Sequence, residues 1–189
     1  EGVAVDVNFT GCEFSSSKKA MTGSGEPIAA IEISNSVNNP VFNVNIEDCT
    51  SKRGFAYDEY ICRVKNDAKS MKNLKITVDG AIVTVSTNAL KAAVSEAGAT
   101  VNVMAGEYTF PSAVAEGVTI NCAKGTVFTG NSKLNIKGAT VVGATFSNPS
   151  GNAVDQTING TFKNCTFTGS NALRYCYVGE TCVFENCVF

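Results

Sequence analysis

The 189-residue sequence contains no histidine, no C-x-x-C pair, no run of like charges and no apolar run long enough to cross a membrane. Without an imidazole, neither a Ser-His-Asp nor a Cys-His catalytic arrangement can be assembled, and a mixed Cys/His zinc site is excluded. The net charge is only −2, which indicates neither a nucleic-acid-binding stripe nor a polybasic membrane patch. We therefore expect no nucleic-acid partner, no membrane insertion, no metal and no cofactor.

The composition that remains is typical of a β-protein. Val, Thr, Asn, Gly and Phe are abundant, with 17 glycines and 11 phenylalanines, whereas strong helix formers are sparse. A chain of this length can bury a hydrophobic core and allows one or two domains.

One short sequence motif, which we call the phrase, is repeated along the chain. The segment Phe162-Lys-Asn-Cys-Thr-Phe167 recurs as Phe184-Glu-Asn-Cys-Val-Phe189. Both Phe residues and the Cys recur after the same number of residues, which lies in the twenties. The phrase recurs as Phe9-Thr-Gly-Cys-Glu-Phe14, more loosely as Ile46-Glu-Asp-Cys-Thr-Ser51, and without the cysteine as Ile136-Lys-Gly-Ala-Thr-Val141. A period of this size predicts a stacked-repeat architecture.

The phrase has a simple physical interpretation. In an extended segment alternate side chains share a face, so Phe162 is expected to point inward and Lys163 outward. Asn164 is a residue type that tolerates a bend with unusual backbone dihedrals, and beyond the bend Cys165 and Phe167 point inward again. The residues expected at the same bend in the other copies include Gly11, Asp48 and Gly138. Stacked copies would place Phe on Phe and Cys on Cys inside a coiled parallel sheet.

The eight cysteines follow the repeat and not the spacing of a metal site. We expect Cys12, Cys165 and Cys187 to be small buried hydrophobic residues in a stack. A disulfide between neighbouring coils is the alternative, and Cys176 and Cys182, which flank a turn, are the first pair to examine.

The pattern predicts one helix, at residues 88–97, with Thr87 or Asn88 as its N-cap and Gly98 past its end. Its apolar face would consist of Leu90, Ala93, Val94 and Ala97.

This helix, followed by Val101-Asn-Val-Met-Ala-Gly-Glu-Tyr-Thr109 and Gly117-Val-Thr-Ile120, resembles the opening of pectate-lyase-like right-handed β-helix proteins, notably bacteriophage tailspikes. The resemblance covers residues 81–189, and residues 1–80 only through the repeated phrase. It implies an all-β fold, a single-stranded right-handed parallel β-helix with one short capping α-helix.

The order of the segments is unusual for such a protein. Residues 81–189 contain the cap helix and the start of the β-helix, whereas residues 1–80 resemble its later coils. We expect one continuous domain with a rotated, circularly permuted order, in which residues 1–80 continue the stack beyond Phe189. The alternative is that residues 1–80 end one β-helix and residues 81–189 begin another.

The acidic residues are scattered, so no catalytic residue is predicted. Aromatic rings beside charged groups could instead contact sugar rings and hydroxyls. The candidate binding residues form two groups: Tyr57, Asp58, Glu59 and Tyr60, and Arg174, Tyr175 and Tyr177. The alternative is that these rings cover the flank of the core or line a subunit contact.

These observations favour a non-enzymatic virion or cell-surface component of tailspike or adhesin type, structural and able to bind a glycan. The resemblance implies a virion or extracellular location and a homo-oligomer, a trimer by analogy. One alternative is a polysaccharide lyase or glycoside hydrolase whose site lies at a subunit interface or in a missing part. Another is an engineered, circularly permuted β-helix scaffold.

Overall fold

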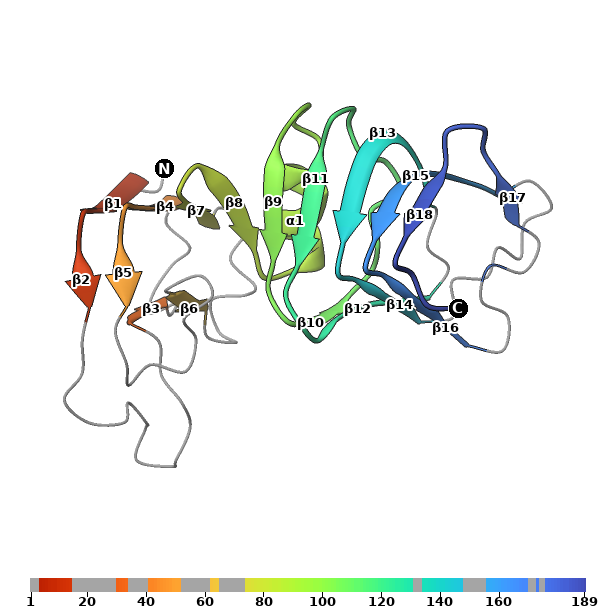
Figure 1. Cartoon of the computed structure of the whole chain (residues 1–189). Helices are drawn as coiled ribbons and strands as arrows, with labels where there is room; N and C mark the ends of the chain where they lie inside the picture. The colour runs from red at the N-terminus through yellow and green to blue at the C-terminus, as the bar shows by residue number, and fades with distance from the viewer. Residues whose placement is uncertain are drawn as a thin grey trace. The chain divides into compact units, whose positions relative to one another are not determined.

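The computed structural model describes residues 4–14, 30–33, 41–51, 62–64, 74–130, 134–147, 156–169, 173 and 176–189. In this part of the chain the fold is the one predicted, an all-β right-handed parallel β-helix with one short helix (Figure 1). The chain divides into two compact units, Glu1–Val83 (unit 1) and Thr84–Phe189 (unit 2), and each is described by itself. The predicted rotated order concerns the placement of these units and stays a prediction.

Unit 1 is built on three parallel strands that pair in the order β1, β4, β7. Phe9 of β1 is in register with Ile46 of β4, so these two copies of the phrase are aligned as predicted. β8 pairs antiparallel with β7 through a turn at Asp79-Gly80, and both turn residues have positive φ, as a two-residue hairpin turn requires. The strands are β1 (Ala4–Thr10), β2 (Glu13–Phe14), β3 (Ile31–Ile33), β4 (Val41–Glu47), β5 (Thr50–Ser51), β6 (Cys62–Val64), β7 (Leu74–Val78) and β8 (Ala81–Thr84).

Unit 2 is a regular stack of coils. The strands β9, β11, β13, β15 and β18 run side by side in the same direction, and β10, β12, β14 and β16 form a second parallel sheet (Figure 1). β17 pairs with the first part of β15. The strands are β9 (Thr100–Val103), β10 (Gly106–Tyr108), β11 (Thr119–Cys122), β12 (Thr126–Thr129), β13 (Asn135–Val142), β14 (Thr145–Ser147), β15 (Gln156–Lys163), β16 (Thr166–Thr168), β17 (Cys176–Val178) and β18 (Val183–Glu185).

Aromatic side chains fill the interior of unit 2, as the phrase predicts. Phe162 and Phe184 are in register and stack with ring centroids 5.5 Å apart. Phe146 stacks on Phe167 at 5.1 Å, and Phe167 stacks on Phe189 at 5.2 Å. Phe146, Phe162 and Phe167 are at most 1% exposed. Burial of side chains of this size stabilises the fold by roughly 1.5–3 kcal/mol each.

The bend of the phrase uses left-handed backbone, again as predicted. Asn164 and Asn186 both have φ of 53°, and the corresponding residues of unit 1, Gly11 and Asp48, have φ of 62° and 51°. The bend also continues the hydrogen bonding between coils, because the Asn164 N–H donates to the Glu185 carbonyl at 2.8 Å. Glycine, Asn and Asp recur at this position because they tolerate such φ values.

One predicted copy of the phrase was wrong. Gly138 does bend with φ of 79°, but the residue in register with Phe162 is Val141, not Ile136. The segment equivalent to Phe162–Phe167 is therefore Val141–Phe146, in which Gly143 makes the bend and Ala144 takes the place of Cys165. The bends at Gly138 and Gly143 lie in one coil and share the pattern apolar, x, Gly, Ala. The prediction aligned the phrase with the bend at Gly138 instead of the one at Gly143.

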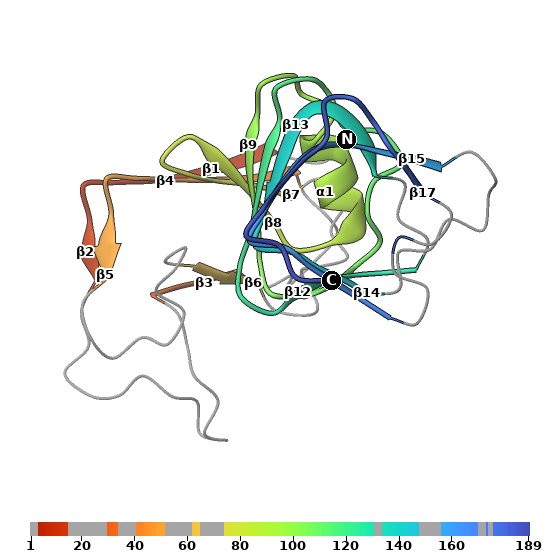
Figure 2. The same ribbon diagram turned by 45° about the vertical axis from the view of Figure 1, so that its right-hand side comes forward.

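Helix α1 (Thr87–Ala93) is shorter than the predicted 88–97 and begins earlier. Its N-cap is Ser86, not Thr87 or Asn88, and the Ser86 Oγ accepts a hydrogen bond from the Ala89 N–H at 3.2 Å. The helix ends at Val94, whose carbonyl accepts from the Ala115 N–H at 2.9 Å, and Ala97 is exposed beyond it. Leu90, Ala93 and Val94 are buried, and Figure 2 shows α1 within the outline of the coils of unit 2.

Candidate functional site

Most of the predicted binding residues fall outside the described part of the chain. These are Tyr57, Asp58, Glu59, Tyr60, Arg174 and Tyr175. Tyr177 is described: it lies on β17, in register with Thr157 of β15, and is 62% exposed. Its phenol is therefore accessible to a ligand, and the grouping with its predicted neighbours stays a prediction.

A different set of polar side chains is assembled on the outer face of unit 1. In β1, β4 and β7 the inward residues are apolar, for example Val44 and Ile76, which are 2% and 1% exposed. The alternate residues face outward and form two rows across the sheet, which we call the polar ladder. Its members are Asp6, Asn43 and Lys75 in one row and Asn8, Asn45 and Thr77 in the other.

Hydrogen bonds between strands fix this polar ladder. The Asn45 Nδ2 donates to the Asn8 Oδ1 at 2.8 Å, and the Thr77 hydroxyl donates to the Asn45 Oδ1 at 2.6 Å. In the other row the Asn43 Nδ2 donates to the Asp6 carboxylate at 2.6 Å. A carboxamide has two donor hydrogens and two acceptor positions, so each amide retains hydrogen-bonding capacity toward solvent or a ligand.

The outer face of unit 2 carries a related but less uniform array. A threonine row, in register across four coils, consists of Thr100, Thr119, Thr140 and Thr161. Beside it, the Asn121 Nδ2 donates to the Asn102 Oδ1 at 3.2 Å. The array changes chemistry in the later coils, where Lys163 and Glu185 form an ion pair of 2.8 Å. This face therefore combines an amide pair with a charged pair.

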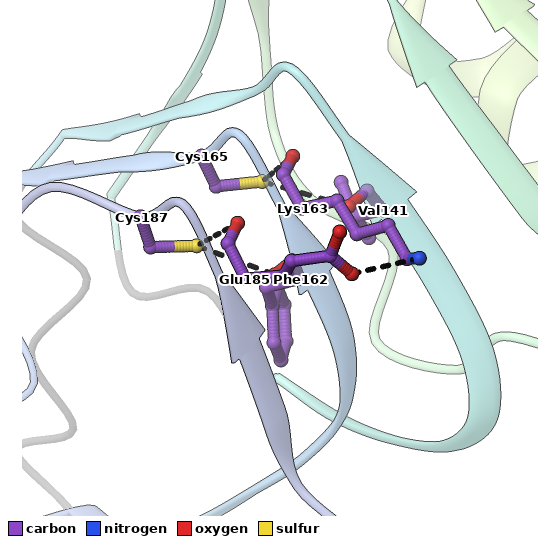
Figure 3. A network of polar contacts seen from close by, with 6 residues as sticks. All are labelled: Val141, Phe162, Lys163, Cys165, Glu185 and Cys187. Atoms are coloured by element: carbon purple, nitrogen blue, oxygen red, sulfur yellow. Dashed lines mark hydrogen bonds and ion pairs between the residues drawn. The ribbon is translucent and has the colours of Figure 1, made fainter.

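Cysteine thiols line the inner side of the bend next to that ion pair (Figure 3). The Cys165 thiol donates to the Lys163 carbonyl at 3.3 Å and lies 3.6 Å from the Val141 carbonyl. The Cys187 thiol repeats this one coil later, 3.3 Å from the Phe162 carbonyl and 3.5 Å from that of Glu185. The thiol thus adds a hydrogen bond to backbone carbonyls around the bend, which gives a physical reason for cysteine at this position.

The buried thiols of Cys165 and Cys122 are poorly suited to nucleophilic chemistry. Burial raises the pKa of Cys165 to about 11, and burial, with the neighbouring Cys165 as a smaller cause, raises the pKa of Cys122 to about 12. A thiol must ionise to attack or to bind a metal, so both remain protonated donors near neutral pH. Cys165 is fully buried as predicted, whereas Cys12 and Cys187 are half-buried; Cys182 is a thiol, so the Cys176–Cys182 disulfide is not formed.

The described residues contain no group of three or more Cys, Asp or Glu side chains placed to hold a metal ion. Within the same residues, no helix is long and apolar enough to cross a membrane.

The polar ladder was not predicted, although the sequence contains a pattern that marks its outward positions. Asp6-x-Asn8, Asn43-x-Asn45 and Lys75-x-Thr77 each place two polar residues at alternate positions of a strand. The hydrogen-bonded side chains are 37 residues apart between β1 and β4 and 32 residues apart between β4 and β7. These two steps differ from each other and from the period of the phrase. Alternation alone could locate the outward positions but could not align them.

Compared with known proteins, the chain matches no family model, no curated protein and no solved structure.

Proposed function

We propose that this protein is a non-enzymatic surface component, of tailspike or adhesin type, that binds a glycan on the polar ladder of unit 1. A virion or an extracellular surface is the location that suits such a component. A homo-oligomer, a trimer by analogy with tailspikes, belongs to the same proposal.

The observation that carries the proposal is the order of the polar ladder. Neighbouring strands lie about 4.8 Å apart and alternate residues of one strand about 6.6 Å apart, so the two rows form a regular grid of donors and acceptors. The hydrogen bonds from Asn45 to Asn8 and from Thr77 to Asn45 already fix the side chains. These side chains are therefore already ordered before a ligand binds, so binding loses less side-chain conformational entropy.

The chemistry of the polar ladder suits sugar hydroxyls. Amide and hydroxyl groups both donate to and accept from sugar hydroxyls, a carboxylate accepts from them, and Lys75 adds one cation that would favour an acidic sugar. The outer face of a parallel sheet suits an extended polysaccharide better than it suits a small ligand, which needs a concave pocket.

The test is a glycan-array screen of the purified chain, followed by titration of the best polysaccharide into two matched variants. Asn43→Ala/Asn45→Ala removes two amides from the polar ladder, and we expect affinity to fall by tenfold or more, because at least two hydrogen bonds are lost. Asn102→Ala/Asn121→Ala removes an amide pair of the same kind from unit 2 and should bind as the unaltered chain does.

Equal affinity of both variants, or no glycan binding at all, would contradict the proposal. The same titration mixtures should be assayed for new reducing ends and for unsaturated sugars. Their appearance would favour the lyase or hydrolase alternative.

A further inference from the structure

Two cysteines occupy the same place in neighbouring coils of unit 2. The Val188 N–H donates to the Cys165 carbonyl at 2.9 Å, and Thr166 is in register with Val188. The residue that precedes each of them, Cys165 in one coil and Cys187 in the next, is therefore aligned with its counterpart. The two thiols are stacked neighbours on the inner side of the bend (Figure 3).

The same arrangement recurs in unit 1. The Thr50 N–H donates to the Cys12 carbonyl at 2.9 Å, and Glu13 is in register with Thr50, so Cys12 is aligned with Cys49. The coils of unit 1 are longer than those of unit 2, yet the backbone hydrogen bonds around the two cysteines are the same. The thiol pair is therefore a property of the bend and not of the coil length.

The separation of the stacked cysteines is compatible with a disulfide. Neighbouring strands lie about 4.8 Å apart, and disulfide-linked cysteines have Cα atoms roughly 4.4–6.8 Å apart. The two thiols of unit 2 have matching contacts: the Cys165 Sγ lies 3.3 Å from the Lys163 carbonyl oxygen, and the Cys187 Sγ lies 3.5 Å from that of Glu185. The two sulfurs are therefore also separated by about one strand spacing, and rotation of one side chain about its Cα–Cβ bond brings them together.

We propose that each pair is a reversible redox cross-link, in which Cys165 with Cys187, and Cys12 with Cys49, form disulfides between adjacent coils in the presence of a small disulfide oxidant such as oxidised glutathione. The structure describes the reduced form, in which all four residues are thiols. The disulfide joins side chains that point in parallel and replaces the thiol–carbonyl hydrogen bonds. It is therefore more easily reduced than a relaxed structural disulfide.

The chemistry is thiol–disulfide exchange. One cysteine thiolate attacks a sulfur of oxidised glutathione, which forms a mixed disulfide and releases one glutathione thiolate. The thiolate of the paired cysteine then displaces the second glutathione and closes the disulfide. The two cysteine protons pass to the two glutathione thiolates, so two cysteines are oxidised and one glutathione disulfide is reduced. Because Cys49 and Cys165 are buried in the folded coils, the exchange takes place while the coils form or open.

Cys122 provides an internal control. It is in register with Val103 on one side and lies beside Gly143 on the other, so neither adjacent coil offers it an aligned cysteine. Cys165 lies two coils away from it. The two backbones are therefore about 9.6 Å apart, beyond the ~7 Å limit for the Cα atoms of a disulfide.

The test is refolding of the reduced full chain in glutathione buffers of increasing oxidised fraction, followed by alkylation and peptide mapping by mass spectrometry without reduction. The Cys12–Cys49 and Cys165–Cys187 links should be roughly tenfold more abundant than any other, because they satisfy the distance range of a disulfide in the folded chain. Cys122 should be recovered alkylated. Dithiothreitol should reverse both links, and the urea midpoint should be higher in the oxidised chain, since a cross-link restricts the unfolded state.

Two matched variants separate the links. Cys165→Ala should fold, because Ala144 occupies the equivalent position one coil earlier, and it should lose the link of unit 2 and keep that of unit 1. Cys122→Ala should keep both, and far-UV circular dichroism should confirm that each variant is folded. A folded chain that stays fully reduced in oxidised glutathione would overturn the proposal. A dominant link at Cys122, or a Cys187 link that persists in Cys165→Ala, would overturn it as well.

Discussion

The two units use the same phrase with coils of different length. In unit 1 hydrogen-bonded side chains on neighbouring strands are 37 residues apart between β1 and β4 and 32 residues apart between β4 and β7. In unit 2 the corresponding separation is 19 residues between β9 and β11 and 22 residues between β15 and the turn before β18. The bend residues have similar positive φ in both units, so the phrase sets the corner and the intervening residues set the length of the coil.

The consequence of the shorter coils is a more continuous aromatic interior. Phe146 contacts four other rings, namely Phe110, Phe128, Phe162 and Phe167. In unit 1 the second copy of the phrase has Ile46 in register with Phe9, and among the described side chains Phe9 contacts one ring, that of Phe14, at 6.0 Å. In unit 1 the register also extends beyond the main sheet, since β2 pairs with β5 and β3 with β6, so the two units differ in the residues at the inward positions.

The largest expected effect tests this difference in the core. Phe146→Ala should lower the free energy of unfolding by about 4 kcal/mol, because the cavity lies among rings on all sides. Phe9→Ala should cost only ~1–2 kcal/mol, because Phe9 is half-buried. Urea titration measures both, and hydrogen exchange assigns each loss to its unit. Equal losses would mean that the aromatic stack adds nothing beyond ordinary burial.

The next effect concerns two glycines with positive φ. A Cβ on Gly160 would lie 2.6 Å from Ile136 Cγ1 and 2.9 Å from the Ile136 carbonyl oxygen, whereas a Cβ on Gly11 would meet nothing within 4 Å. Gly160→Ala should therefore destabilise unit 2 by about 3 kcal/mol, the sum of overpacking and backbone strain. Gly11→Ala carries the strain alone, about 1 kcal/mol. A shift of the urea midpoint as large for Gly11→Ala as for Gly160→Ala would show that tight packing of the coils is not the cause.

A smaller effect follows from the buried thiol of unit 2. Burial raises the pKa of Cys165 from 9.0 to about 11, so the folded state retains a proton that the unfolded state releases. The associated stability is fully present below pH 9 and is lost as the pH rises toward 11, a loss of about 1 kcal/mol at pH 10. Cys165→Ala should fold, since Ala144 occupies the equivalent position one coil earlier. Unfolding titrations at pH 7.5 and 10 should show a smaller loss in this variant; an identical loss would contradict the assignment.

Much of the fold was predictable because the phrase indicates both the period of the coils and the position of the backbone bend. The repetition of Phe162 at Phe184 fixed the register of the last coils, and Asn164 and Gly11 indicated the corners. The phrase failed where core residues are smaller: Val141–Phe146 lacks both the first Phe and the cysteine, so a neighbouring bend at Gly138 matched better. The end of α1 was also beyond local pattern, because it is set by the contact of Val94 with Ala115, a residue of the following coil.

The site was less predictable, for a physical reason. Aromatic and charged residues close together in the sequence suggested binding groups at Tyr57–Tyr60 and Arg174–Tyr177. The polar ladder instead gathers pairs such as Asn8 and Asn45, which are distant in the sequence and whose proximity depends on strand register. Alternation along each strand indicates which residues of such a surface face outward, but nothing local in the sequence shows how the strands align.

The smallest expected effects distinguish the outer faces of the two units. Coupling energies from double-mutant cycles should be ~0.5 kcal/mol both for Lys163 with Glu185, a half-exposed ion pair, and for Asn45 with Thr77, a neutral hydrogen bond. In 1 M NaCl the first coupling should fall toward zero, because salt screens charges over about 3 Å, while the second should not change. A salt-dependent Asn45–Thr77 coupling would mean that the nearby charges of Asp6 and Lys75, and not the amides, order the polar ladder. If instead the coupling persists, the row of Asn8, Asn45 and Thr77 should keep its order in salt, because the groups that order this row are neutral.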